Sequence, residues 1–205
     1  MSTGFSPDCT LCPRLADYRA DLKLKYPDYL CQAVDSFGPP GGLLIVGLAP
    51  GAHGANATGR PFTGDHAGIL LYRALFERGL ANQPISHKGD GLALQGARIT
   101  NAVRCVPPAN KPTPDEVRTC RPFLVDELTE ARSFFTLGQI GHVALLDALG
   151  LPRKSLPFGH GTVGILPDGR RVVSSYHPSR YNTQTGRLTH EMFVSALDLA
   201  LKGVN

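Results

Sequence analysis

Apolar runs and amphipathic stretches alternate along most of this chain. Four short runs, rich in branched and aromatic residues, have the length and composition of buried strands. Four other segments place their apolar residues at helical spacing. Strands that alternate with helices predict an α/β fold in which a parallel sheet is covered on both sides. The predicted strands lie at 43–46, 97–105, 133–138 and 171–176, and the predicted helices at 67–76, 114–130, 139–149 and 189–201.

The segment between the first predicted strand and the first predicted helix holds most of the candidate chemistry. It reads Gly-Leu-Ala-Pro-Gly-Ala-His-Gly at 47–54 and Thr-Gly-Arg-Pro-Phe-Thr-Gly-Asp at 58–65. Such a loop lies at the carboxyl edge of an α/β sheet, where open sheets bind ligands. It contains neither of the two common glycine-rich nucleotide motifs. Its polar groups and Phe62 predict a pocket for a planar, polar ring, and the alternative is an ordinary glycine-rich turn.

Local signals outside this loop predict boundaries and connections. Thr113 followed by Pro114 and Glu116 has the composition of a helix start with a capping box. Residues 15–30 are compatible with a helix or with a mobile arm, and the sequence does not decide between them. The polar, glycine-rich stretch at 79–96 predicts a surface excursion.

Composition changes this picture only moderately. The chain has 205 residues, of which 42% are hydrophobic, so we expect one folded domain over 1–205 with an N-terminal arm at about 1–42. A formal net charge of +4 and a pI near 8.9 are compatible with a polyanionic partner. No apolar stretch is long enough to span a bilayer, and no secretion signal opens the chain. We therefore expect a cytoplasmic protein.

Four of the five cysteines form a candidate metal site. Cys9 and Cys12 make a C-x2-C pair, and Cys105 and Cys120 are separated by fourteen residues. Four thiolates suit either a tetrahedral zinc ion or an iron–sulfur cluster, and the spacing does not choose between them. Disulfides and unrelated buried thiols are the alternatives. Cys31 is expected to be a free thiol.

Together these features resemble the family 5, or type B, uracil-DNA glycosylases. The resemblance covers the chain from about Cys9 to Leu201. It implies a three-layer α/β/α sandwich around a four-stranded, mainly parallel sheet, and an enzyme that extrudes a damaged base from DNA and cuts its N-glycosidic bond. The residues that carry it are the runs at 47–54 and 58–65, the segment 103–114, and His-Pro-Ser at 177–179 with the residues 182–189.

The resemblance also implies a cofactor. The four-cysteine pattern is similar to the [4Fe-4S] site shared by family 4 and family 5 enzymes. Hydrolysis requires no electrons, so such a cluster is expected to be structural. The implied ligands are Cys9, Cys12, Cys105 and Cys120.

If the resemblance holds, the catalytic residues are Asp65, His177 and Asn110, and Phe62 binds the base. Phe62 is expected to stack on the flipped base, and His177 to donate a hydrogen bond to the charge that develops on uracil O2. Asp65 is expected to position water or to stabilise the sugar cation, because Ala52 occupies the position at which most relatives of the wider superfamily carry a polar residue. The structural alternatives are a core phenylalanine, a turn histidine and a helix N-cap.

Base recognition and DNA binding complete the implied site. Asn110 matches a family 5 position, whereas Asn101 is closer to the family 4 pattern, and either amide can pair with a uracil edge. An extra amide at Asn101 is expected to narrow specificity. Gly51, Ala52 and His53 are expected beside the base. The residues expected to face DNA are Arg60, Lys111, Arg180, Tyr181, Arg187 and Leu188, with Tyr181 and Leu188 filling the vacated stack.

The expected activity is therefore that of a monofunctional, monomeric glycosylase of base-excision repair, which takes uracil and other deaminated bases such as hypoxanthine from double-stranded DNA. Two alternatives stay open. One is the uracil-specific activity of family 4, and the other is a non-catalytic iron–sulfur module that binds damaged DNA.

Overall fold

A mixed five-stranded sheet forms the centre of the protein. The computed structural model describes residues 4–204, so the first three residues of the predicted N-terminal arm lie outside it. The strand order is β2-β1-β3-β5-β4, and every pair is parallel except β4 with β5. The strands are β1 (Gly42–Gly47), β2 (Ala97–Asn101), β3 (Ala131–Leu137), β4 (Val163–Ile165) and β5 (Arg171–Ser175).

The predicted α/β fold is confirmed, but the prediction of four strands misses β4. This strand has only three residues and lies at the edge of the sheet, where Val163 and Ile165 remain exposed. An edge strand this short carries too few apolar residues for a periodic pattern. Its antiparallel pairing with β5 makes the sheet mixed.

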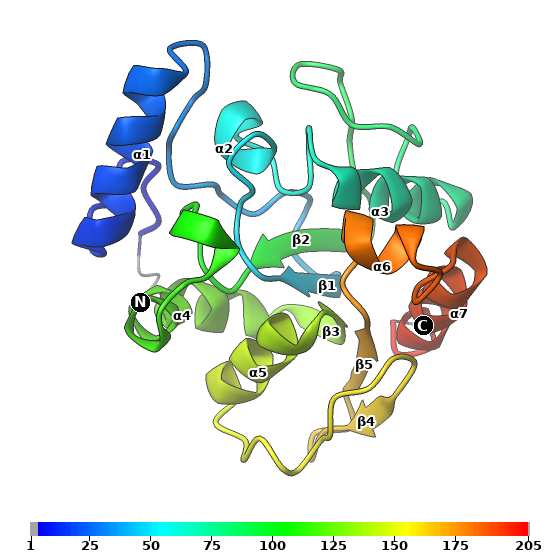
Figure 1. Cartoon of the computed structure of the whole chain (residues 1–205). Helices are drawn as coiled ribbons and strands as arrows, with labels where there is room; N and C mark the ends of the chain where they lie inside the picture. The colour runs from blue at the N-terminus through cyan, green and yellow to red at the C-terminus, as the bar shows by residue number, and fades with distance from the viewer. Residues whose placement is uncertain (1–3, 205) are drawn as a thin grey trace.

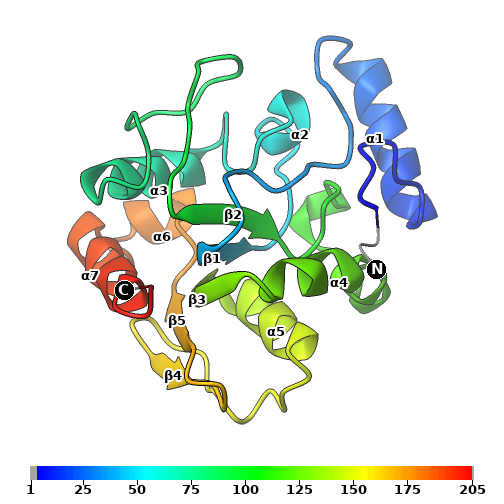
Figure 2. The same cartoon turned by 180° about the vertical axis from the view of Figure 1, so that it is seen from behind.

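Helices cover both faces of the sheet (Figures 1 and 2). α3 and α7 lie on one face, and α4 and α5 on the other. Within residues 4–204, no helix combines the length and the apolar character needed to cross a membrane. The helices are α1 (Pro13–Lys25), α2 (Ala55–Thr58), α3 (His66–Glu77), a 3₁₀ turn η1 (Pro108–Asn110), α4 (Pro114–Leu128), α5 (Gln139–Ala148), α6 (Arg180–Gln184) and α7 (His190–Leu201).

Strand β1 shows why two helical layers form. Its side chains alternate between the faces, as the pleat requires. Leu43 and Ile45 join the core beneath α3 and α7, whereas Leu44 and Val46 join the core beneath α4 and α5. All four are at most 2% exposed, so the strand is buried on both faces, as its apolar run predicts.

The predicted capping box at the start of α4 is confirmed. Glu116 N–H donates to Thr113 Oγ1 at 3.3 Å, and Thr113 N–H donates to Glu116 Oε2 at 2.7 Å. The Glu116 carboxylate also accepts two hydrogen bonds from the Arg14 guanidinium on α1. One side chain therefore caps α4 and joins it to the N-terminal helix.

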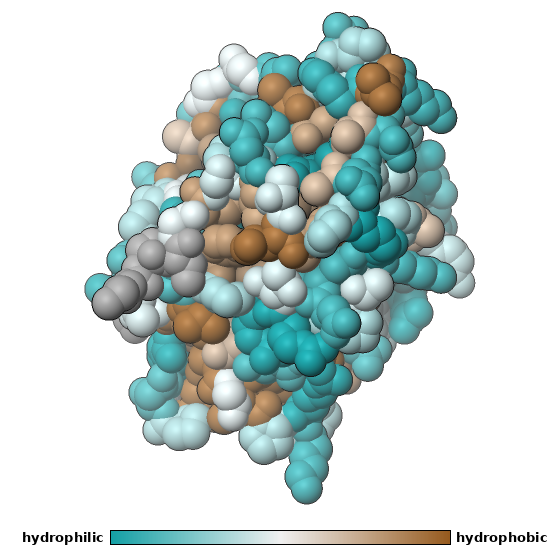
Figure 3. All heavy atoms as spheres, turned by 90° about the vertical axis from the view of Figure 1, so that its left-hand side faces the viewer, coloured by the Kyte–Doolittle hydropathy of each residue, from teal (hydrophilic) through white to brown (hydrophobic). Residues whose placement is uncertain are grey.

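The N-terminal segment that the sequence leaves undecided is a helix, α1. Arg19, which is 6% exposed, reaches from α1 to the carbonyl oxygens of Pro7 and Cys9 and holds the residues before the helix. Figure 3 shows the side of the molecule on which α1 lies, where apolar patches interrupt a largely hydrophilic surface. In this structure the helical part of the arm packs on the rest of the chain.

Strand β2 is shorter than the predicted 97–105. After Asn101 the chain leaves the ladder and follows the loop after β1, since Ala102 N–H donates to Gly47 O and Val103 N–H donates to Leu48 O. β1, β2 and β5 are parallel, so the loops that follow these three strands all begin at one edge of the sheet. Edges of this kind bind ligands in open α/β folds.

Candidate active site

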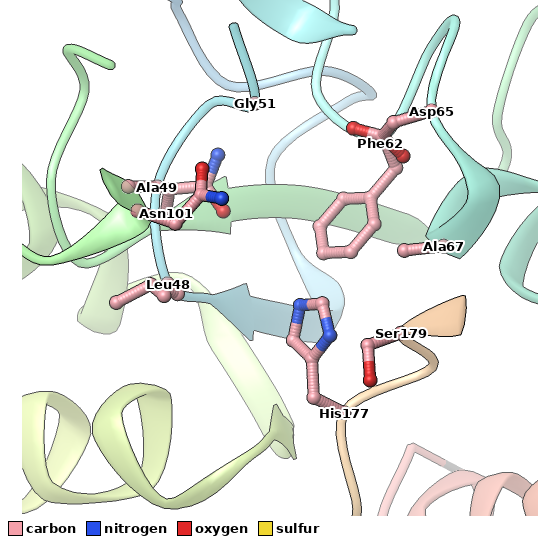
Figure 4. A pocket seen from close by; sticks show the side chains of 10 residues that line it. Leu48, Ala49, Gly51, Phe62, Asp65, Ala67, Asn101, His177 and Ser179 are labelled. Atoms are coloured by element: carbon pink, nitrogen blue, oxygen red, sulfur yellow. The ribbon is translucent and has the colours of Figure 1, made fainter. Parts of the chain in front are cut away.

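A cavity of about 320 Å³ opens at this edge. Six of the predicted site residues line it, and Figure 4 shows the rings of Phe62 and His177 pointing toward each other across it. The complete lining is Leu48, Ala49, Gly51, Phe62, Asp65, Ala67, Asn101, Asn110, His177 and Ser179.

Phe62 is held in the cavity by an unusual backbone. Its φ is +54°, in the left-handed region that side chains other than glycine rarely adopt. The Tyr72 hydroxyl fixes the preceding turn by donating to Pro61 O at 2.6 Å. Gly68 admits the Phe62 carbonyl oxygen, which would lie 1.8 Å from a Cβ at that position. The result is a ring with its centroid 6.0 Å from that of His177 and tilted by 29° to it.

His177 follows β5 and is fixed from both sides. Asn182 donates its amide N–H to His177 O at 2.8 Å, and Gly138 leaves room where a Cβ would come 3.1 Å from His177 Cβ. Burial lowers the pKa of His177 from 6.5 to about 4. The imidazole is therefore neutral near pH 7, and one of its ring nitrogens can donate a hydrogen bond.

Asp65 is the N-cap of α3, which is the structural alternative that the sequence offers for it, and it accepts a hydrogen bond from Gly68 N–H at 3.2 Å. Burial raises the pKa of this carboxyl, and the backbone amides of Gly68 and Ala67 offset part of the rise. Gly54 packs directly on it, since a Cβ there would lie 2.5 Å from Asp65 Oδ2. A carboxylate destabilised by burial at a cavity wall is a feature typical of functional sites.

Two asparagines approach the cavity differently. Asn101 is 3% exposed, and its Oδ1 has no hydrogen-bond partner in the structure. Buried polar atoms are nearly always paired, so this oxygen is available for an N–H group of a ligand. Gly47 makes room for it, because a Cβ there would lie 2.4 Å from Asn101 Oδ1 and 2.8 Å from the Phe62 ring. Asn110 is exposed at the rim.

Comparison with known proteins shows the family of this chain. Residues 35–200 match the model of the uracil DNA glycosylase superfamily. A type-5 uracil-DNA glycosylase from Thermus thermophilus is 48% identical over 198 residues, covering 92% of this chain and 90% of that protein. The type-5 enzyme of Pyrobaculum aerophilum is 41% identical over 93% of this chain and 86% of its own length. This chain belongs to the type-5 uracil-DNA glycosylases.

The type-4 branch is less similar. A type-4 uracil-DNA glycosylase from Pyrobaculum aerophilum is 39% identical over 118 residues, which is 56% of this chain and 53% of that protein. The type-5 relatives therefore match a much larger part of the chain, as the resemblance in the sequence implies.

Not every residue predicted beside the base lies in the cavity of this type-5 glycosylase. Ala52 and His53 do not line it. His53 is exposed and is bonded to the Tyr29 hydroxyl at 3.0 Å through Nδ1. Ser179 lines the cavity but is missing from the predicted residues, although the His-Pro-Ser motif contains it. It also caps α6 by accepting from Asn182 N–H.

Four of the residues predicted to face DNA are exposed. Tyr181 on α6 is 70% exposed, and Arg187 lies over the Tyr176 ring at 4.5 Å. Lys111 lies in the proline-rich segment, and Arg180 and Arg187 lie in the segment after β5. The exposed members of the set are Lys111, Arg180, Tyr181 and Arg187.

Two others are largely buried in this conformation. Leu188 is 1% exposed and belongs to the core beneath α3 and α7, so it does not project from the surface as a wedge would. Arg60 is ion-paired with Asp90 at 2.8 Å and lies over the Phe37 ring at 4.7 Å. Its side chain is 17% exposed, which leaves it poorly placed for a phosphate.

The cysteines of the candidate metal site lie in one part of the fold. Cys105 and Cys120 are buried in a small core with Leu15, and Cys9 and Cys12 pack against the same core. All five cysteines are free thiols, and Cys31 lies apart with Asn56 Nδ2 3.4 Å from its sulfur. Burial raises the pKa of Cys105 to about 12 and that of Cys120 to about 11, and the neighbouring thiols add to both shifts.

Proposed function

We propose that this type-5 glycosylase hydrolyses the N-glycosidic bond of a uracil flipped out of double-stranded DNA. The observation that carries the proposal is one cavity lined by a stacking ring, a neutral imidazole, a carboxylate and an unpaired amide oxygen. Flipping a base costs a few kcal/mol, which the pocket must offset. The four groups are Phe62, His177, Asp65 and Asn101.

Recognition of the base is assigned to Phe62 and Asn101. Stacking on Phe62 contributes about 1–3 kcal/mol, by analogy with other base–aromatic pairs. Asn101 Oδ1 accepts a hydrogen bond from uracil N3–H. Cytosine has no hydrogen at N3, so it would leave this buried oxygen unpaired, and an unpaired buried acceptor is costly.

Cleavage of the N-glycosidic bond is assigned to His177 and Asp65. It leaves a cationic, oxocarbenium-like sugar and a uracil anion whose charge is shared with O2. The neutral His177 donates a hydrogen bond to that oxygen and stabilises the anion. The Asp65 carboxylate stabilises the sugar cation or orients the water that adds to C1′. Asn110, at the rim, contacts the same nucleotide.

We further propose a permissive, monofunctional reaction. Hypoxanthine presents an N–H beside a carbonyl, as uracil does, and is the second substrate expected. Among residues 4–204, none that lines the cavity is a lysine, which supports hydrolysis without the Schiff base that a lyase needs. The abasic product should therefore stay intact until alkali cleaves it. We also propose that the enzyme acts on DNA in the cytoplasm and that it acts as a monomer.

We also propose that Cys9, Cys12, Cys105 and Cys120 hold a structural [4Fe-4S] cluster. The packing of all four cysteines against one small core supports this. A four-iron cluster is larger than one ion and takes four thiolates. When bound, it would link the segment before α1 to the segment after β2 and to α4.

The cluster has a direct test. Cys105→Ala should remove the broad absorption that four-thiolate iron clusters show at roughly 400 nm. Cys31→Ala is the matched control and should keep it. A colourless wild-type protein that contains zinc would refute the assignment.

The activity is tested by single-turnover excision from duplexes that hold one uracil or one hypoxanthine, with and without alkaline scission. Release of both bases, and strand breaks only after alkali, would support the whole proposal. Breaks without alkali would refute the monofunctional reaction.

A second candidate function is the uracil-specific activity of type 4, which the unpaired amide of Asn101 favours. Release of uracil alone would establish it. Binding of abasic DNA without release of either base would instead indicate a non-catalytic module.

A further inference from the structure

The surface excursion between α3 and β2 contacts residues on both sides of Phe62, which lines the cavity. Arg60, two residues before Phe62, reaches into the excursion with one guanidinium nitrogen. Arg60 Nη1 donates to Ser86 Oγ at 2.9 Å, to His87 O at 3.2 Å and to Asp90 Oδ1 at 2.8 Å. A residue predicted to meet phosphate is thus bound inside the protein.

Asp90 organises the excursion around this contact. Its carboxylate accepts hydrogen bonds from Gln83 Nε2 at 2.8 Å, from Leu92 N–H at 3.0 Å and from His87 N–H. Burial alone would raise its pKa, but the bonds from the His87 and Leu92 amides and the Arg60 guanidinium lower the pKa to about 2. Asp90 is therefore a fixed negative charge at every working pH.

A second contact lies on the other side of Phe62. Thr63, which is fully buried, and Ser86 share a hydrogen bond of 2.6 Å between their hydroxyl oxygens. Phe62 is therefore bracketed, because residues on both sides of it are bound to the same excursion. A strained φ such as that of Phe62 persists only where the surroundings enforce it.

We propose that Asp90 and Ser86 are positioning residues for the flipped base. They hold Arg60 and Thr63, and through them they hold the Phe62 ring at the place where it stacks. The inference rests on the proposed function, since it assumes that Phe62 stacks on the base. It gives the excursion a role in base excision, through Asp90 and Ser86.

A double-mutant cycle separates positioning from general stabilisation. We would measure the single-turnover rate constant for uracil excision in Ser86→Ala and Asp90→Asn, each alone and combined with Phe62→Ala. A residue that acts through Phe62 loses its effect once the ring is gone. Each single variant should lower the rate, up to the roughly fivefold to 150-fold loss that stacking sets for Phe62→Ala, and should cause no further loss in the Phe62→Ala background.

The affinity for abasic duplex should change less than about twofold, because neither residue contacts DNA in this proposal. Asp168→Asn is the control, since it alters another aspartate paired with an arginine, in the turn between β4 and β5. It should leave the rate unchanged. Equal losses with and without the Phe62 ring would overturn the inference.

Hydrogen exchange gives a readout that does not depend on activity. Peptides that cover residues 60–65 should exchange faster in Asp90→Asn, while those from β3 should not. If Asp90→Asn does not fold, Ser86→Ala decides the question, because it removes a single hydroxyl. A wild type that releases no uracil would refute the proposed function, whereas unchanged exchange at 60–65 would refute the positioning role.

Discussion

The protonation of His177 has a consequence for stability that can be measured. The imidazole has a pKa near 4 in the fold and an ordinary pKa of 6.5 when exposed. Between these values the unfolded chain binds a proton that the folded protein excludes, so stability falls as the pH falls. From pH 8 to pH 5 this one group should cost about 2 kcal/mol, or about 4–8 °C in Tm for a chain of this size.

His177→Gln isolates the effect, because glutamine does not titrate. We would compare thermal unfolding of the wild type and the variant by circular dichroism at pH 8 and at pH 5, with identical heating rates. The stability gap between the two proteins should shift by the amount given above in favour of the variant at pH 5. Equal losses in both proteins, or an imidazole resonance that titrates near pH 6.5 in the wild type, would show that the ring is not held neutral.

The other predictions concern its neighbours. Asp65→Asn should lower the excision rate and raise Tm, because burial raises the pKa of Asp65 and so disfavours its charged form at pH 7; a lower Tm would contradict this. Gly54→Ala should lower the excision rate but not the affinity for abasic DNA, since its Cβ would displace the Asp65 carboxylate; unchanged kinetics would show that the loop adapts. Leu188→Ala should lower the free energy of unfolding in urea by about 2–5 kcal/mol, as a core truncation does. A loss of DNA affinity without a loss of stability would instead support a role for Leu188 in filling the vacated stack.

Local sequence patterns predicted the features that depend only on residues close together in the chain. The capping box of α4 and the N-cap of α3 involve residues within three positions of each other, so the sequence displays them completely. The buried run of β1 is equally direct. The shortest elements were missed, because β4 has three residues and α2 has four, which is too few to show a period.

The burial of Leu188 had a signal in the sequence. Leu188 immediately precedes the N-cap Thr189 of α7, and Phe193 is the fourth residue of that helix. This is the spacing of a hydrophobic staple, in which two such apolar residues pack together. Both belong to the same core in the structure.

Arg60 gave no comparable signal. Its partner Asp90 is thirty residues away, in a stretch whose composition indicates only a polar loop. Pairing over such a separation depends on how α3 returns the chain to the cavity. It is set by tertiary structure and not by a local pattern.

The glycines around the cavity decide how its specificity can be altered. Gly47, Gly54 and Gly68 already present bare backbone to their neighbours, and each has a contact closer than a methyl group allows. The cavity therefore cannot be enlarged at these three positions by a smaller side chain. A directed-evolution library aimed at bulkier lesions should therefore vary the lining residues Asn110 and Ser179, and leave the glycines intact.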